Sequence, residues 1–214
     1  MGEREQLIWE LRDQGIRDEA VLRAMATVPR DAFVDPRYRG AAWRNHPLPI
    51  GWDQTISQPF IVALMTQLIE VGPGDSVLDV GTDCGYQAAV LAVLGCRVHG
   101  IEVVDELAAV ARGNLADLGF LVDVASGDGR RGRPEHAPFD GIVVAAASQD
   151  IPPALLGQLR VPTPDRRGGR MVIPIGDSGE QVLVLVERTA DGYQEREVER
   201  VRFVPLVGGS DRAH

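Results

Sequence analysis

The sequence predicts an α/β fold: a mostly parallel seven-stranded sheet with helices on both faces, an antiparallel final hairpin and a helical extension at the N-terminus. Two observations predict this arrangement. After residue 74, short apolar runs alternate with helical segments, which is typical of a parallel sheet covered on both faces. An Asp191-Gly192 pair separates the last two apolar runs, and this pair favours a tight antiparallel connection.

The first 58 residues predict two short helices and then an irregular stretch. Leu7, Ile8 and Leu11 recur at helical spacing before Gly15, and a second helix is expected around residues 21–25. Residues 28–58 keep no period and are interrupted by prolines. A stretch of about thirty residues without regular structure is unusual in a compact domain and is often functional.

The remaining residues predict the sheet and its covering helices. Pro59 suits the first turn of a helix that carries one apolar face and is followed by Gly72-Pro73-Gly74. The expected strands are 76–80, 97–102, 121–125, 141–145, 170–175, 181–186 and one ending near 204. The expected later helices are near 85–94, 105–118 and 153–159. We expect one domain over 1–214, with 1–58 covering a core of 59–214.

The composition excludes several kinds of chemistry. The chain has 214 residues and a formal charge of −9, and all 22 basic residues are arginine. Without lysine there is no Schiff base to a carbonyl substrate and no phosphate-loop lysine. The acidic balance argues against a nucleic-acid partner, which needs a basic surface. No apolar run is long enough to span a membrane and no signal peptide is evident, so a cytoplasmic location is expected. The chain is also expected to be a monomer.

The cysteines and histidines predict neither a disulfide framework nor a structural metal. Cys84 and Cys96 are too few to cross-link a chain of this length, and reduced thiols are expected. The four histidines are scattered along the chain without the spacing of metal ligands.

A glycine-containing turn follows the first strand of the predicted sheet. Gly81 and Gly85 bracket it at the point where a helix begins, which is where an open α/β sheet binds a nucleotide. Glu102 ends the second strand, 21 positions after Gly81, and from there a carboxylate accepts hydrogen bonds from ribose hydroxyls. Together they predict an adenosine cofactor.

The charge of this turn favours S-adenosylmethionine over a dinucleotide. Asp79 and Asp83 would place carboxylates around a pyrophosphate, which costs energy, whereas a sulfonium with an α-amino group suits them. Asp128 and Gly129 follow the third strand, where an aspartate can accept from the adenine amino group. Taken singly, Asp79 or Asp128 is more often a turn or cap residue.

Several segments then carry a family resemblance. Residues 54–59 read Gln-Thr-Ile-Ser-Gln-Pro, and residues 77–82 read Val-Leu-Asp-Val-Gly-Thr. The other matching segments are 28–30, 33–34, 47–51, 85–89, 127–129, 139–140, 172–176 and 203–206. In this order they resemble the protein L-isoaspartate O-methyltransferases. The resemblance implies a Rossmann-like class I methyltransferase fold. It also implies an activity of the EC 2.1.1 class, the methylation of the free carboxylate of isoaspartyl residues in damaged proteins. The ester then closes to a succinimide, whose hydrolysis partly restores aspartate.

The resemblance also implies a set of site residues. Ser57 would lie in the active site, and Glu102 would hold the ribose. The residues expected at the cofactor are Gln54, Thr55, Ile56, Ser57, Gly81, Thr82, Asp83, Gly85, Glu102, Val103, Asp128 and Gly129. An isoaspartyl carboxylate is ionised at neutral pH, so attack on the sulfonium methyl needs no general base, and Ser57 would aim the carboxylate. In the alternative interpretation, Ser57 caps the helix begun by Pro59.

This chain departs from the family at a few positions. Family members usually have glycine and serine at Asp83 and Cys84, and Arg44 and Trp52 also differ. An alternative function is therefore methylation of a carboxylate in one dedicated natural-product peptide. A non-enzyme alternative is a degenerate module that binds S-adenosylmethionine. Residues 161–167 lengthen a link that is usually brief, and a solvated surface loop is expected there.

Overall fold

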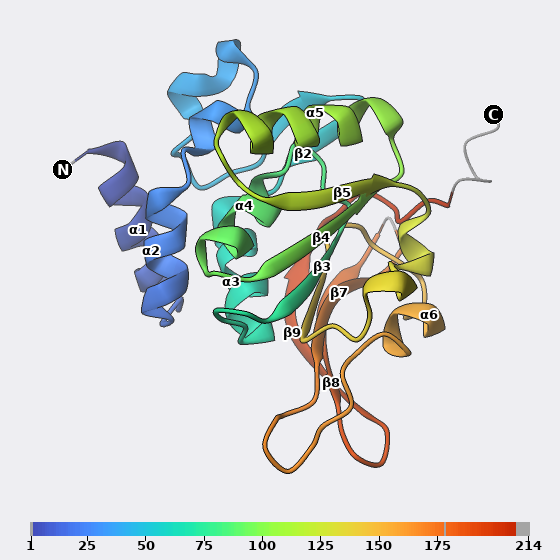
Figure 1. The fold of residues 1–214 in the computed structure, drawn as a ribbon. Coiled ribbons are helices and arrows are strands. Elements are labelled where there is room, and N and C mark those ends of the chain that lie inside the picture. The colour runs from blue at the N-terminus through green and yellow to red at the C-terminus, as the bar shows by residue number, and fades with distance from the viewer. Residues whose placement is uncertain (1, 178, 209–214) are drawn as a thin grey trace.

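The computed structural model describes residues 2–177 and 179–208, and a seven-stranded sheet organises them (Figure 1). The strands are β3 (Ser76–Val80), β4 (Arg97–Glu102), β5 (Val122–Ser126), β6 (Gly141–Val144), β7 (Arg170–Gly176), β8 (Gln181–Arg188) and β9 (Tyr193–Val201). Their order across the sheet is β5-β4-β3-β6-β7-β8-β9. The first five are parallel and the last two join antiparallel, so the predicted α/β sheet with its final hairpin is confirmed.

Helices cover both faces, as predicted. The α-helices are α1 (Glu3–Asp13), α2 (Glu19–Thr27), α3 (Pro59–Ile69), α4 (Tyr86–Val93), α5 (Asp105–Asp117) and α6 (Pro153–Leu156). Alternate strand residues face opposite cores: Val77 packs with α1 to α5, whereas Leu78 packs in a smaller core with α6. Helices α1 and α2 lie outside this layer, against α3 and α4 (Figure 1).

The stretch 28–58 is more regular than its sequence predicts. It contains short 3-10 helices at Arg30–Phe33 and Pro36–Ala41, and a hairpin of β1 (Leu48–Gly51) and β2 (Gln54–Ile56). The expectation of no regular structure is wrong in this part. Trp52 and Asp53 form the two-residue turn with φ of 50° and 56°. This left-handed turn is typical of Asn-Gly, so Trp-Asp gives no turn signal.

The link 161–167 is exposed but anchored to the sheet. Arg166 Nη2 lies 2.6 Å from Asp75 Oδ1 and 3.0 Å from Asp140 Oδ1, and Arg167 pairs with Glu70. The expected solvated loop is therefore held by ion pairs to two other segments. Glu70 itself ends α3 in a left-handed conformation, two residues before the glycine-proline signal.

Two further findings concern the cysteines and the lengths of the helices. Cys84 and Cys96 are free and buried. Over the part of the chain that the structure describes, no helix combines the length and the apolar composition needed to cross a bilayer.

Candidate active site

The site lies where the strand order reverses. Strand β3 has β4 on one side and β6 on the other, so the loops after these strands diverge and leave a crevice at their carboxyl ends. The loop after β3 keeps positive φ angles at Gly81 (76°), Asp83 (52°) and Gly85 (95°). A Cβ at Gly85 would lie 3.0 Å from Leu115 Cγ, so this glycine lets α4 approach α5.

Glu102 is held rigidly at the end of β4. Its side chain is buried, Oε2 accepts a 3.0 Å hydrogen bond from the Asp83 N–H, and Oε1 accepts a 2.9 Å hydrogen bond from the Val104 N–H. The carboxylate therefore ties the loop after β3 to the loop after β4. Since a carboxylate has about four lone-pair positions, it keeps capacity to accept ligand hydroxyls.

Two further carboxyl groups lie beside Glu102. Asp79 is fully buried, and neither of its carboxyl oxygens has a hydrogen-bond partner among the described residues. Burial and, secondarily, Glu102 raise the pKa of Asp79 to about 8. Burial also raises the pKa of Asp83 well above its ordinary value, and Glu102 and Asp79 add to this effect. A cationic ligand would stabilise the ionised form of these groups.

Three adjoining hollows surround this acidic loop. The strand-end cavity is lined by residues at or just after the ends of β3, β4 and β6, including Gly81, Glu102 and Ala145. The inner cavity reaches Ile56, Ser57 and Thr82. The outer groove opens to solvent between Thr55 and Arg202.

Most of the residues expected from the sequence line these hollows. They are Gln54, Thr55, Ile56, Ser57, Gly81, Thr82, Asp83, Glu102, Val103 and Gly129. Gly85 and Asp128 line none of the three. Asp128 instead caps the short helix that follows it, where Oδ1 accepts from the Arg130 N–H at 3.0 Å and lies 3.3 Å from Arg130 Nε. The contact of Asp128 with adenine stays a prediction.

Ser57 lies between β2 and α3 and lines both the inner cavity and the outer groove. The alternative that it caps α3 is wrong, because Gln58 is the N-cap residue and the Phe60 N–H in the first turn donates to Asn45 Oδ1 at 3.0 Å. The Ser57 hydroxyl makes no hydrogen bond to a described residue of the chain. It is therefore available to a ligand that bridges the two hollows.

The sequence did not reveal two segments that close the strand-end cavity. Ala145 and Ala146 follow β6, and residues 204–207 follow β9. The Ala147 N–H donates to Val204 O at 2.8 Å, which brings the two segments together. The reversal of strand order at β3 could have indicated the end of β6, and the family resemblance of residues 203–206 could have indicated the second segment.

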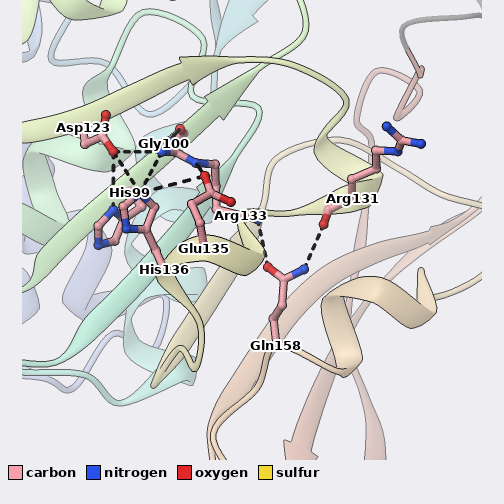
Figure 2. A network of polar contacts seen from close by, with 8 residues as sticks. All are labelled: His99, Gly100, Asp123, Arg131, Arg133, Glu135, His136 and Gln158. Carbon is pink, nitrogen blue, oxygen red and sulfur yellow. Dashed lines mark hydrogen bonds and ion pairs between the residues drawn. The ribbon is translucent and has the colours of Figure 1, made fainter.

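The structure also brings together two histidines that looked scattered (Figure 2). The rings of His99 and His136 stack with centroids 4.0 Å apart and 20° between their planes, and Asp123 lies beside both. These two histidines, 37 positions apart in the sequence, are therefore neighbours in the fold. Nearly parallel rings cannot direct their in-plane lone pairs at one metal ion.

Arg133 takes the position that a cation would need among these groups. Its Nη2 lies 2.9 Å from Asp123 Oδ2 and 2.8 Å from His136 Nε2, and Nη1 donates to Gly100 O at 3.2 Å. Gln158 accepts from the Arg133 N–H at 2.8 Å (Figure 2). The geometry favours an arginine-centred network that fastens the segment after Gly129 to β4 and β5.

Comparison with known proteins places this site in context. The model of the family described as "Protein-L-isoaspartate(D-aspartate) O-methyltransferase (PCMT)" matches residues 2–211. A protein-L-isoaspartate O-methyltransferase of Salinibacter ruber is 50% identical over 210 residues, covering 96% of this chain and 91% of its own. One from Gloeobacter violaceus is 48% identical over 207 residues, covering 96% and 98%.

Solved structures agree with these sequence matches. A protein-L-isoaspartate O-methyltransferase structure has a TM-score of 0.86 at 27% identity, covering 96% of this chain and 66% of that chain. A Plasmodium falciparum beta-aspartate methyltransferase in complex with S-adenosyl-L-homocysteine has a TM-score of 0.82 at 25% identity, covering 97% and 99%.

Proposed function

Because the chain belongs to the protein-L-isoaspartate(D-aspartate) O-methyltransferase family, we propose how its own residues perform the family's reaction. The activity is an S-adenosylmethionine-dependent methyl transfer to the carboxylate of L-isoaspartyl residues, a protein repair reaction. Bound S-adenosylmethionine supplies a methyl group on a positively charged sulfur.

The strand-end cavity fits such a cofactor. Glu102 would accept hydrogen bonds from the ribose hydroxyls, and Val103 and Gly129 would line the adenosine part. Gly81, Thr82 and Asp83 would border the methionine part. The residues that line this cavity support the fit, because they include the carboxyl groups of Asp83 and Glu102 and, among the residues that the structure describes, no basic side chain. An acidic, arginine-free cavity favours a cation over a pyrophosphate.

Ser57 would position the substrate. The single observation that carries this role is that Ser57 lines the inner cavity and the outer groove with its hydroxyl uncommitted. The attacking isoaspartyl carboxylate is already ionised at neutral pH, so the chain need not remove a proton. A hydroxyl that donates to one carboxylate oxygen leaves the other free to attack, and alignment is then the main contribution to the rate.

The hairpin β1–β2 would cover the reacting groups. Gln54 lines both the strand-end cavity and the outer groove, and Thr55 lines the groove. Residues 54–57 would therefore separate the cofactor from solvent while the groove admits an extended isoaspartyl peptide. We also propose that the enzyme is cytoplasmic, that it is a monomer, and that it acts without a nucleic-acid partner. The two buried free cysteines are compatible with a reducing compartment.

A methyl-transfer assay tests this function. The purified chain should transfer methyl groups from S-adenosylmethionine to an isoaspartyl peptide and not to the same peptide with normal aspartate. Equal methylation of both peptides would contradict the substrate assignment. The alternative of a dedicated peptide substrate came from positions at which this chain differs from its family. Of these, Arg44 and Trp52 line none of the three hollows, whereas Asp83 lines all three.

A further inference from the structure

Asp83 stands in the loop after β3 with a φ of 52°, in the left-handed region. Glycine adopts this conformation freely, whereas aspartate adopts it at some energetic cost. The bond from the Asp83 N–H to Glu102 Oε2 helps to hold the backbone there. The chain therefore places a carboxyl group where a residue without a side chain would be less strained.

The position of this carboxyl group is unusual within the site. Asp83 and Ala145 each line the strand-end cavity, the inner cavity and the outer groove. Ala145 has no polar side-chain atom, so the carboxyl group of Asp83 is the ionisable group that is common to the linings of all three hollows. Its carboxyl oxygens accept no hydrogen bond from any residue that the structure describes.

The surroundings of Asp83 favour a positively charged partner. Asp79 and Glu102 are its acidic neighbours, and together they raise the pKa of Asp83 beyond the effect of burial. Among the residues that the structure describes, no basic side chain lines the strand-end or the inner cavity. Arg200 and Arg202 line only the outer groove. A cation in the cavities would therefore meet carboxyl groups that lack a counter-charge.

Resting on the proposed function, we infer that the Asp83 carboxylate binds the α-ammonium group at the methionine end of the cofactor. This group offers three N–H donors, which match the free acceptor oxygens of Asp83. The sulfonium carries charge but no hydrogen-bond donor. Asp83 is then a binding determinant that distinguishes cofactors that carry the amino acid from those that lack it.

Calorimetric titration with two ligands tests this role. S-Adenosylhomocysteine carries the α-ammonium group, whereas 5′-methylthioadenosine carries the same nucleoside without it. For Asp83→Asn, the affinity for S-adenosylhomocysteine should fall roughly ten- to a hundredfold, since a charged hydrogen bond is lost. Its affinity for methylthioadenosine should stay within about twofold, because that ligand never meets the ammonium site.

A matched control uses Asp53, which also has a positive φ but lines none of the three hollows. Asp53→Asn should bind both ligands as the unchanged chain does. Equal loss of both ligands by Asp83→Asn would mean a structural role and would overturn the inference. Tighter binding of S-adenosylhomocysteine by Asp83→Gly would also overturn it, because the side chain would then obstruct the cofactor.

Proton release gives a second measurement. Because the pKa of Asp83 is raised in the free protein, an ammonium partner should drive its ionisation. Titrations in two buffers of different ionisation enthalpy should show proton release on binding S-adenosylhomocysteine, and less release for Asp83→Asn. Equal release by both would contradict the inference. If the unchanged chain methylates isoaspartyl peptide while Asp83→Asn binds S-adenosylhomocysteine with unchanged affinity, only this inference fails and the proposed function stands.

Discussion

The backbone N–H of Asp83 donates a 3.0 Å hydrogen bond to Oε2 of Glu102, and this bond joins the loop after β3 to the end of β4. Glu102 also accepts from the Val104 N–H. One buried carboxylate therefore joins two loops of the proposed cofactor site through hydrogen bonds within the chain itself. This preorganisation limits the entropy that binding must remove.

Glu102→Ala should weaken cofactor binding. The lost charge-assisted hydrogen bonds to the ribose correspond to roughly 1.5 to 3 kcal/mol. Calorimetric titration with S-adenosylhomocysteine measures the change, and circular dichroism should show a retained fold. Glu106→Ala is the control, because Glu106 is exposed on α5 close by. Unchanged affinity of the Glu102 variant would remove this residue from the cofactor site.

Ser57→Ala should reduce turnover on an isoaspartyl peptide while leaving cofactor affinity nearly unchanged. Loss of one donor to a charged acceptor corresponds to roughly 1.5 to 3 kcal/mol, or about ten- to a hundredfold. The melting temperature should not change, because Gln58 rather than Ser57 is the N-cap residue of α3. Ser148→Ala, outside the three hollows, is the control. A fully active Ser57 variant would point to a substrate held by backbone donors.

Arg133→Leu should destabilise the fold. The variant loses the hydrogen bond to Gly100 O and the contacts with Asp123 and His136, which we expect to cost about 1 to 3 kcal/mol. Asp123 is half-exposed, so water can hydrate its remaining charge. Denaturant unfolding measures the loss. Arg131→Leu, at an exposed neighbour, should change the free energy of unfolding little, and an equal loss in both would refute the network's role.

Stability should fall as the pH drops below the ordinary histidine pKa of about 6.5. Burial, and then His136, lowers the pKa of His99 in the folded chain, with Arg133 acting in the same direction and Asp123 opposing. The unfolded chain therefore takes up the proton first, and protonation favours unfolding. Thermal melts above and below this pH should show the effect. His99→Gln should reduce it, whereas exposed His46→Gln should retain it; equal slopes in all three proteins would exclude His99 as the cause.

Much of the fold could be predicted because its signals are local. The apolar runs that became β3 and β4 match the structure at both ends, and the Asp191-Gly192 turn predicted the final hairpin. Glu102 and Gly81 could likewise be predicted, because both adjoin a strand end whose position the hydrophobic pattern determines. The hairpin at Trp52 could not, since Trp-Asp is not a pair that favours the left-handed turn these two residues adopt.

The sequence by itself determined which side chains reach the carboxyl ends of neighbouring strands: Glu102, the acidic loop at Asp83, and the serine before α3. Only the tertiary structure decided what meets them. It placed Ala145 and residues 204–207 across the cavity, left the Ser57 hydroxyl without a partner among residues 2–177 and 179–208, and set Arg133 between Asp123 and the stacked histidines. The physical reason is that these contacts join residues far apart in the chain, and the order of strands in the sheet, which no local pattern specifies, decides which of them become neighbours.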